Sequence, residues 1–159
     1  MISAFTETGL RAVGFSGFEA VSALRSSGSS SVPISPGVYI VLRDDSDGPA
    51  WLAASVGGHF KGKDPSVSAA VLKANWIAGT PVIYIGKADQ LRRRLQQYMD
   101  FGAGRPVGHW GGRLIWQIRG SDAFRVAWAE DAHPLAREAR MIRGFMAEFG
   151  AMPFANLRL

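Results

Sequence analysis

A tyrosine, a lysine and an arginine follow one another closely in the middle of the chain, where an apolar run gives way to a basic amphipathic stretch. Tyr84 stands in the run Val-Ile-Tyr-Ile-Gly, Lys87 follows three residues later, and Arg94 lies ten residues after the tyrosine. A strand followed at once by a helix would bring these side chains to one corner. An arginine beside the core suits a phosphate, because its planar group donates two parallel hydrogen bonds and keeps its charge. The sequence therefore predicts a corner that holds a phosphodiester.

A carboxylate on the apolar face of a late helix is the second candidate. The spacing predicts a helix over about 133–149, whose buried face holds Leu135, Met141, Ile142, Phe145 and Phe149 and also Glu138. The residues three and four positions away from Glu138 cannot form a salt bridge with it. Since burying an uncompensated carboxylate costs roughly several kcal/mol, we expect either a divalent metal ion or an arginine from another element, such as Arg94, to compensate it.

Four further polar residues are ambiguous when each is taken alone. Tyr39 in a predicted strand is typical of a core tyrosine with a satisfied hydroxyl, and Tyr98 shares one side of the basic helix with Arg94. Asn156 alone is typical of a turn or a cap. His109 lies in the run Gly-His-Trp-Gly-Gly, which predicts a loop with a solvated imidazole.

Together these residues form an ordered set: Gly-Val-Tyr at 37–39, Tyr-Ile-Gly-Lys at 84–87, then Arg94, Tyr98, Glu138 and Asn156. The set resembles the GIY-YIG nuclease superfamily, and residues 82–98 are most similar to the nuclease domain of the bacterial excision-repair incision subunit. The resemblance covers about residues 36–42, 81–100 and 124–157. It implies a metal-dependent endonuclease that hydrolyses DNA phosphodiester bonds, restriction-like or repair-like. The implied catalytic residues are Tyr39, Tyr84, Lys87, Arg94, Tyr98, Glu138 and Asn156.

The resemblance also implies roles for these residues. Glu138 would be the sole protein carboxylate on Mg2+ (or Mn2+), an ion that prefers oxygen ligands and keeps several waters. Either Tyr39 or Tyr84 would deprotonate the attacking water, and we favour Tyr39; a phenol with a pKa near ~10 must first be acidified by Lys87, Arg94 or the metal. Asn156 would position Glu138 or the backbone of the corner. Candidate contacts to DNA are Arg92, Arg93, Arg105, His109, Arg113 and Arg140.

Two departures from the family pattern affect what can be carried over. Compact members join the two tyrosine strands by a short turn, whereas residues 40–83 separate Tyr39 from Tyr84 here, so an insertion near 45–80 should project from the hairpin. Some restriction-type members place a histidine on the arginine helix, where this chain has Tyr98. That role is not transferred to His109.

Length and charge fit one domain with a polyanionic partner. The 159 residues suit a single domain over 1–159, with residues 1–35 as an N-terminal extension. Residues 1–84 hold six basic and six acidic residues, and residues 85–159 hold twelve and seven, so the whole net charge of +5 follows the Tyr-Ile-Gly corner. The chain has no cysteine, no apolar run of transmembrane length and no secretory pattern at its start, which favours a cytoplasmic location without membrane contact.

The expected fold is α+β, with a small mixed or antiparallel three-stranded sheet flanked by helices. We predict strands at 36–42, 82–85 and 124–129. We predict helices near 17–25, from Asp64, after Asp89 as N-cap, and over 133–149 behind Asp131 as cap, ending at Gly150. Residues 51–56 fit a strand, and 113–118 fit either a strand or a short helix.

Two other functions remain open alongside the nuclease. One is a catalytically inactive nucleic-acid-binding module on the same fold, and the other is a protein-interaction domain whose basic half meets an acidic partner. Analogy with restriction-type relatives, and nothing else in the sequence, suggests that the protein could act as a homodimer.

Overall fold

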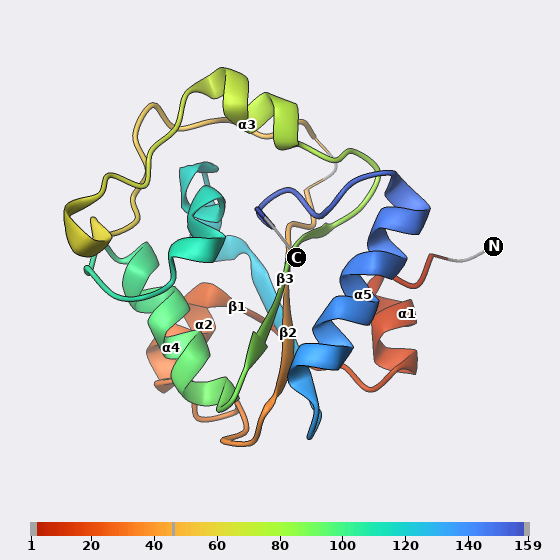
Figure 1. Ribbon diagram of the computed structural model, residues 1–159. Helices are drawn as coiled ribbons and strands as arrows, with labels where there is room; N and C mark the ends of the chain where they lie inside the picture. The colour runs from red at the N-terminus through yellow and green to blue at the C-terminus, as the bar shows by residue number, and fades with distance from the viewer. Residues whose placement is uncertain (1–2, 46, 158–159) are drawn as a thin grey trace.

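The computed structural model describes residues 3–45 and 47–157 and has an antiparallel sheet between two layers of helices. Four strands, β1 (Ser16–Ala20), β2 (Gly37–Leu42), β3 (Val82–Ala88) and β4 (Arg125–Glu130), pair in the order β1-β4-β2-β3. In Figure 1, α1 (Glu7–Ala12) and α5 (Pro134–Phe149) cover one face, and α2 (Val21–Ser27) and α4 (Leu91–Gly102) cover the other. The predicted α+β class is confirmed, with one more strand than expected.

Strand alternation divides the apolar residues between two cores. Val38 and Ile40 of β2 point toward α5 and pack with Phe145, whereas Tyr39 and Val41 point toward α4. Both sets are fully buried because helices cover both faces of the sheet. Successive residues of β2 and β3 therefore serve different layers of the molecule.

The N-terminal part differs from the prediction of a helix over 17–25. Residues 16–20 form β1, and only the second half of that range is helical, in α2. Gly17 has a φ of +90°, and a Cβ at this position would lie 2.5 Å from the indole of Trp128. The close approach and the bulge between Gly17 and Glu19 break the strand alternation, which is why the pattern in the sequence is misleading.

The insertion does not project from the β2–β3 hairpin but lies along the domain (Figure 1). The N–H groups of Leu52, Val56 and Gly58 donate to carbonyls of Gln117, Trp116 and Phe101, at 2.9, 3.2 and 2.9 Å. Aromatic contacts among Trp51, Trp76 and Phe154 join it to the C-terminal segment.

Local structure within the insertion also departs from the sequence expectations. The predicted strand over 51–56 is reduced to one bridge between Trp51 and Ile118. The short 3-10 helix η1 (Phe60–Gly62) follows, and α3 (Ala69–Asn75) begins only after Ser68, whose hydroxyl accepts from the N–H of Val71. Asp64 therefore does not cap a helix.

The chain between α4 and β4 contains two 3-10 helices, η2 (Trp110–Gln117) and η3 (Ser121–Ala123). Residues 113–117 of the ambiguous stretch 113–118 are therefore helical, in the second part of η2, and not a strand. The buried side chain of Gln117 accepts from the N–H of Val67 at 2.9 Å and donates to the carbonyls of Leu52 and Val67 at 3.0 and 2.8 Å. One glutamine on η2 thus satisfies three backbone groups of the insertion.

The two long helices form where expected, but two predicted caps are wrong. Gln90 rather than Asp89 is the N-cap residue of α4 and makes no side-chain cap bond. The N-cap residue of α5 is His133 rather than Asp131, and Asp131 accepts from the N–H of His133 at 2.7 Å. The helix is followed by Gly150 in the left-handed conformation, as expected. Leu135, expected on the buried face, is 65% exposed. Within residues 3–45 and 47–157, no helix is both long and apolar enough to cross a membrane.

Replacing Gln117 by alanine should loosen the insertion, because three buried backbone groups lose their partner. We expect the free energy of unfolding to fall by about 1–3 kcal/mol, measured by urea denaturation. Gln96→Ala is the matched control: Gln96 is exposed and donates one bond of 3.2 Å to Gly28, so its loss should stay within about 0.5 kcal/mol. Equal stability of the two variants would contradict this anchoring.

Candidate active site

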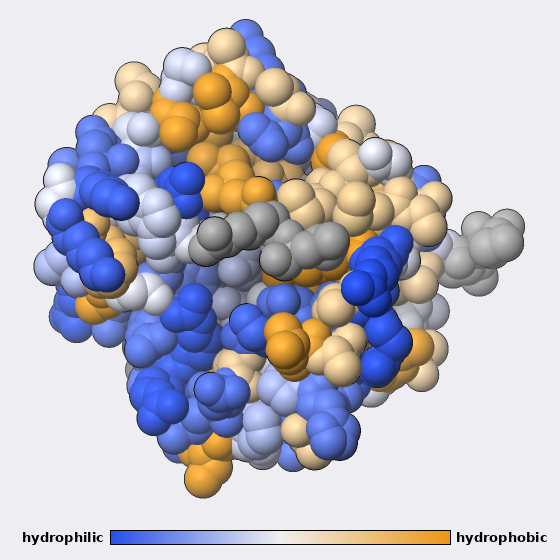
Figure 2. Space-filling model, viewed as in Figure 1, coloured by the Kyte–Doolittle hydropathy of each residue, from blue (hydrophilic) through white to orange (hydrophobic). Residues whose placement is uncertain are grey.

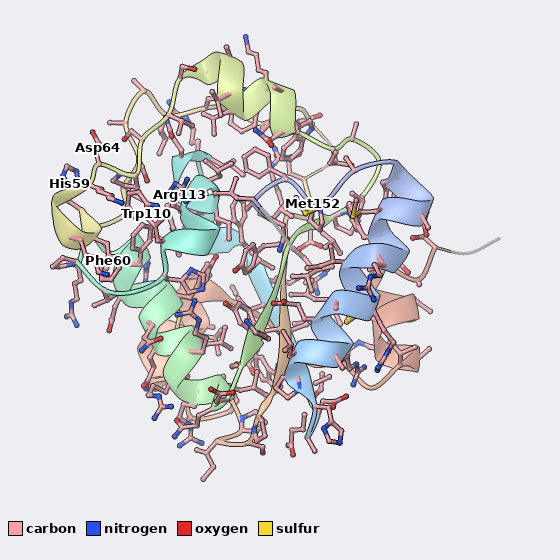
Figure 3. All side chains as sticks on the ribbon, in the orientation of Figure 1. His59, Phe60, Asp64, Trp110, Arg113 and Met152 are labelled. Carbon is pink, nitrogen blue, oxygen red and sulfur yellow. The ribbon has the colours of Figure 1, made fainter. Side chains whose placement is uncertain are left out.

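A cleft of about 490 Å³ opens beside β3, between η2 and α5. Its lining residues are Tyr84, Lys87, Trp110, Gly111, Arg113, Glu138 and Leu157. A second hollow of about 300 Å³, which includes Arg93, Arg94 and Gln97, shares Lys87 with it. Because β3 is the edge strand, side chains on both of its faces reach the cleft. In Figure 3, Trp110 and Arg113 lie on the η2 side of β3, away from α5, and Figure 2 shows hydrophilic residues gathered over α4 below this region.

The β2–β3 pairing places Tyr39 directly beside Gly86. A Cβ at Gly86 would lie 2.4 Å from Cζ and 2.7 Å from the hydroxyl of Tyr39. The phenol therefore lies across the glycine, and only a residue without a side chain fits there. Tyr39 is fully buried, with its ring centroid 5.9 Å from that of Tyr84, which is 8% exposed and lines the cleft.

His109 is fully buried, so the expectation of a solvated loop histidine is wrong. Its Nε2 shares a hydrogen bond of 2.7 Å with the hydroxyl of Tyr39. Its ring lies 5.8 Å from that of Tyr84 and 5.1 Å from that of Tyr98. Gly112 makes room for it, since a Cβ there would lie 2.7 Å from the imidazole. A buried imidazole cannot contact a DNA backbone, and His109 instead supports Tyr39.

Burial controls the protonation of this aromatic cluster. It lowers the pKa of His109 to about 3 and raises the pKa of Tyr39 well above its ordinary value, with nearby Tyr84 adding to the rise. Burial also raises the pKa of Tyr84, while Arg94 acts in the opposite direction. At neutral pH the imidazole is therefore uncharged.

Tyr98 does not reach the cleft. Its ring packs 4.7 Å from that of Trp116, and its buried hydroxyl has no hydrogen-bond partner among the described residues. Burial raises its pKa. This placement favours a supporting role behind His109 over contact with a substrate.

Glu138 projects from α5 into the cleft and is half-buried. Burial raises its pKa, whereas Lys87 and Arg94 act to lower it. The alternative of an ion pair with Arg94 is not observed: Arg94 donates through Nη1 to the carbonyl of Gly108 at 2.5 Å and to Gln97 at 3.1 Å. Over the described ranges, neither Glu138 nor Arg94 belongs to an ion pair.

The possible metal ligands at the cleft are few. No group of three or more His, Cys, Asp or Glu side chains within the described part of the chain is placed to enclose a metal ion. A single half-buried carboxylate suits Mg2+, which is commonly held by one or two carboxylates together with waters and substrate phosphate oxygens.

Asn156 fixes the edge of β3. Its side-chain oxygen accepts from the N–H of Ile85, and its amide donates to the carbonyl of Ile85, both at 2.9 Å. The N–H of Ala155 donates to the carbonyl of Ile83 at 2.9 Å. The C-terminal segment thus pairs with the strand on either side of Tyr84, so Asn156 holds the backbone of the corner.

The arginines predicted to contact DNA have different environments. Arg92 donates to the carbonyls of Val32 and Ser30 and holds the connector after α2. Arg105 is exposed and lies 3.4 Å from Asp100, and Arg140 is exposed on α5. Arg93 borders the smaller hollow and Arg113 borders the cleft. Of the six predicted contacts, these last two lie beside the candidate site.

Three cleft residues were not predicted from the sequence: Trp110, Gly111 and Leu157. The available signal was the glycines around Trp110, because repeated glycines mark close approach of a backbone. Comparisons with protein-family models, with curated proteins and with solved structures give no match to this chain.

Gly86→Ala should displace Tyr39, because the added methyl group overlaps the phenol. We expect a loss of about 1–3 kcal/mol in unfolding free energy, measured by urea denaturation. Gly144→Ala on α5 is the control: its nearest contact is 3.8 Å away, and a helical alanine should stabilise by up to about 1 kcal/mol. A Gly86 variant as stable as the wild type would show that the phenol is not held against this strand.

The buried neutral His109 should make folding sensitive to acid. The unfolded chain binds a proton at this residue below pH ~6.5, and the folded chain does so only near pH 3. The free energy of unfolding should therefore fall as the pH drops from ~6.5 toward 3, by about 1.4 kcal/mol per pH unit from this group. The contribution of His109 to stability is complete above this window. His109→Gln should flatten the slope in denaturation at pH 4–7. A slope equal to that of the wild type would contradict the assignment.

Proposed function

We propose that the protein is a GIY-YIG-type endonuclease that hydrolyses DNA phosphodiester bonds with Mg2+ or Mn2+. The observation that supports this best is the carboxylate of Glu138, half-buried without a described ion-pair partner, in the same cleft as Tyr84 and Lys87. A carboxylate, a phenol and a cation around one cleft match the needs of metal-assisted hydrolysis.

Glu138 is the residue that would hold the metal ion. Burial disfavours the ionised carboxylate and raises its pKa, and a bound cation would offset this by stabilising the charged form. When bound, Mg2+ supplies Lewis-acid polarisation of the scissile phosphate and stabilises the leaving oxygen.

Tyr84 is the tyrosine placed to meet the attacking water. It lines the cleft, whereas Tyr39, favoured from the sequence, lies fully buried behind it. Tyr84 orients the water through its oxygen and, when ionised, accepts its proton. Burial raises the pKa of Tyr84 and Arg94 offsets only part of this rise, so ionisation of the phenol would also need the charge of a bound metal ion. Tyr39 and His109 fix the neighbouring ring by packing and by their shared hydrogen bond.

Arg94 and Lys87 provide the positive charge for the phosphate. Arg94 uses Nη1 to bind Gly108 and Gln97. Its hydrogen bonds within the described ranges use Nη1, and the guanidinium also lies close enough to the Tyr39 hydroxyl to oppose the rise of its pKa. We propose that the other N–H groups bind phosphate oxygens. Lys87 is exposed between the two hollows and attracts the same group. Such contacts stabilise the charge that develops in the transition state.

The decisive experiment is Mg2+-dependent nicking of plasmid DNA by purified wild type and Glu138→Gln. We expect wild type to cut with Mg2+ and not with EDTA, and the variant to lose at least about 100-fold in rate, because one carboxylate holds the metal. Glu148→Gln, in the last turn of the same helix, is the control and should cut normally.

Other outcomes separate the remaining alternatives. If neither wild type nor variant cuts but both retard DNA in a gel at low salt, the protein is an inactive binding module on this fold. If the protein neither cuts nor binds DNA, a protein-interaction domain is the better explanation. Cutting that does not depend on Glu138 would overturn the proposed site.

A further inference from the structure

We propose that Trp110 and Arg113 form a subsite for an unpaired nucleobase next to the reacting phosphate. The preferred substrate class would then be DNA with single-stranded or extrahelical nucleotides at the cut. This inference rests on the proposed nuclease function and specifies its substrate.

Trp110 differs from the other aromatic residues packed around it. Trp116, Phe101 and Tyr98 are fully buried, whereas Trp110 is partly exposed and lines the cleft. The guanidinium of Arg113 lies 4.8 Å from its ring centroid, and Phe101 meets it edge-on at 6.3 Å. Arg113 also donates to the carbonyl of Trp110 at 3.0 Å. The indole is therefore held in place with a cation over one of its two faces. Rigid aromatics in basic grooves are the platforms on which unpaired bases stack.

The residues that suit a metal ion and a phosphate come from different elements of the cleft than the residues that suit a base. Glu138 and Lys87, which suit a metal ion and a phosphate, come from α5 and β3, whereas Trp110 and Arg113 come from η2 on the other face of the sheet (Figure 3). The volume of about 490 Å³ falls in the range of sites that hold a drug-sized molecule, which exceeds a phosphate group. Inside a stacked duplex both faces of each base are covered, so a base away from the duplex ends must leave the stack to lie on an indole.

The space between Trp110 and the catalytic tyrosine is open. At Gly111 an added Cβ would have a single close neighbour, the hydroxyl of Tyr84 at 3.8 Å. The loop before it is fixed by Arg94, whose Nη1 binds the carbonyl of Gly108. The residue proposed to bind the phosphate therefore also holds the loop that carries the aromatic platform.

The test measures binding in the Glu138→Gln background, so that DNA stays intact. Fluorescence anisotropy would compare a labelled 20-nucleotide single strand, a flapped duplex and a blunt duplex. Adding Trp110→Ala should weaken binding to the single strand and to the flapped duplex by about tenfold, because one stacked base is lost. Binding to the blunt duplex should change by less than about twofold. Trp110→Phe should keep most of the affinity. Arg113→Ala should resemble Trp110→Ala, and Arg119→Ala, at an exposed arginine outside the cleft, is its control.

A direct readout of stacking completes the test. A 2-aminopurine in the single strand should lose fluorescence on binding when Trp110 is present and keep it with Trp110→Ala, with thermal unfolding used to check that each variant is folded. Equal losses on all three DNAs, or quenching that persists without the indole, would overturn the subsite. If plasmid cutting still depends on Glu138 in that case, the nuclease assignment stands and only this inference fails. If no DNA binds at all, both fail.

Discussion

The close contact between the phenol of Tyr39 and the bare backbone of Gly86 is the constraint on which the candidate site depends. The antiparallel register places the two residues side by side, and the missing side chain lets the ring lie across the strand. In that position the hydroxyl shares a hydrogen bond with His109. The imidazole in turn occupies the space left by Gly112 and packs against Tyr84 and Tyr98. Two glycines in different elements thus determine how three tyrosines meet one histidine.

This cluster is not optimised for stability. Of the described buried polar side-chain atoms without a partner, three belong to it or border it: the hydroxyl of Tyr98, Nδ1 of His109 and Nε1 of Trp116. Each such group costs roughly 1–3 kcal/mol when it is left unsatisfied. Unsatisfied groups that gather at one place in an otherwise well-bonded domain are typical of a site kept for function. The burial that makes them costly also keeps His109 uncharged.

Periodic segments could be predicted from the sequence, and positions set by tertiary contacts could not. Strands β2, β3 and β4 and helix α5 lie where apolar alternation and helical spacing place them. β1 was missed because a bulge interrupts its alternation, and the path of the insertion depends on Gln117, a residue far away along the chain. Glu138 does reach the cleft, but the burial of His109 could not be inferred, because a glycine-rich run gives no periodicity. The consecutive arginines Arg92, Arg93 and Arg94 turn by about 100° each along the helix, so each has a different environment.

The two margins of the sheet limit how two copies of the chain can associate. The C-terminal segment already occupies the outer side of β3 through Asn156. On the opposite margin, β1 bends at Gly17 and Phe18, both with positive φ, and so presents no regular ladder of donors and acceptors to a second strand. A sheet that continues from one molecule into the next is therefore disfavoured at both ends. Any homodimer would have to form through helices or the insertion, and self-templated aggregation through strand addition is hindered by the same geometry.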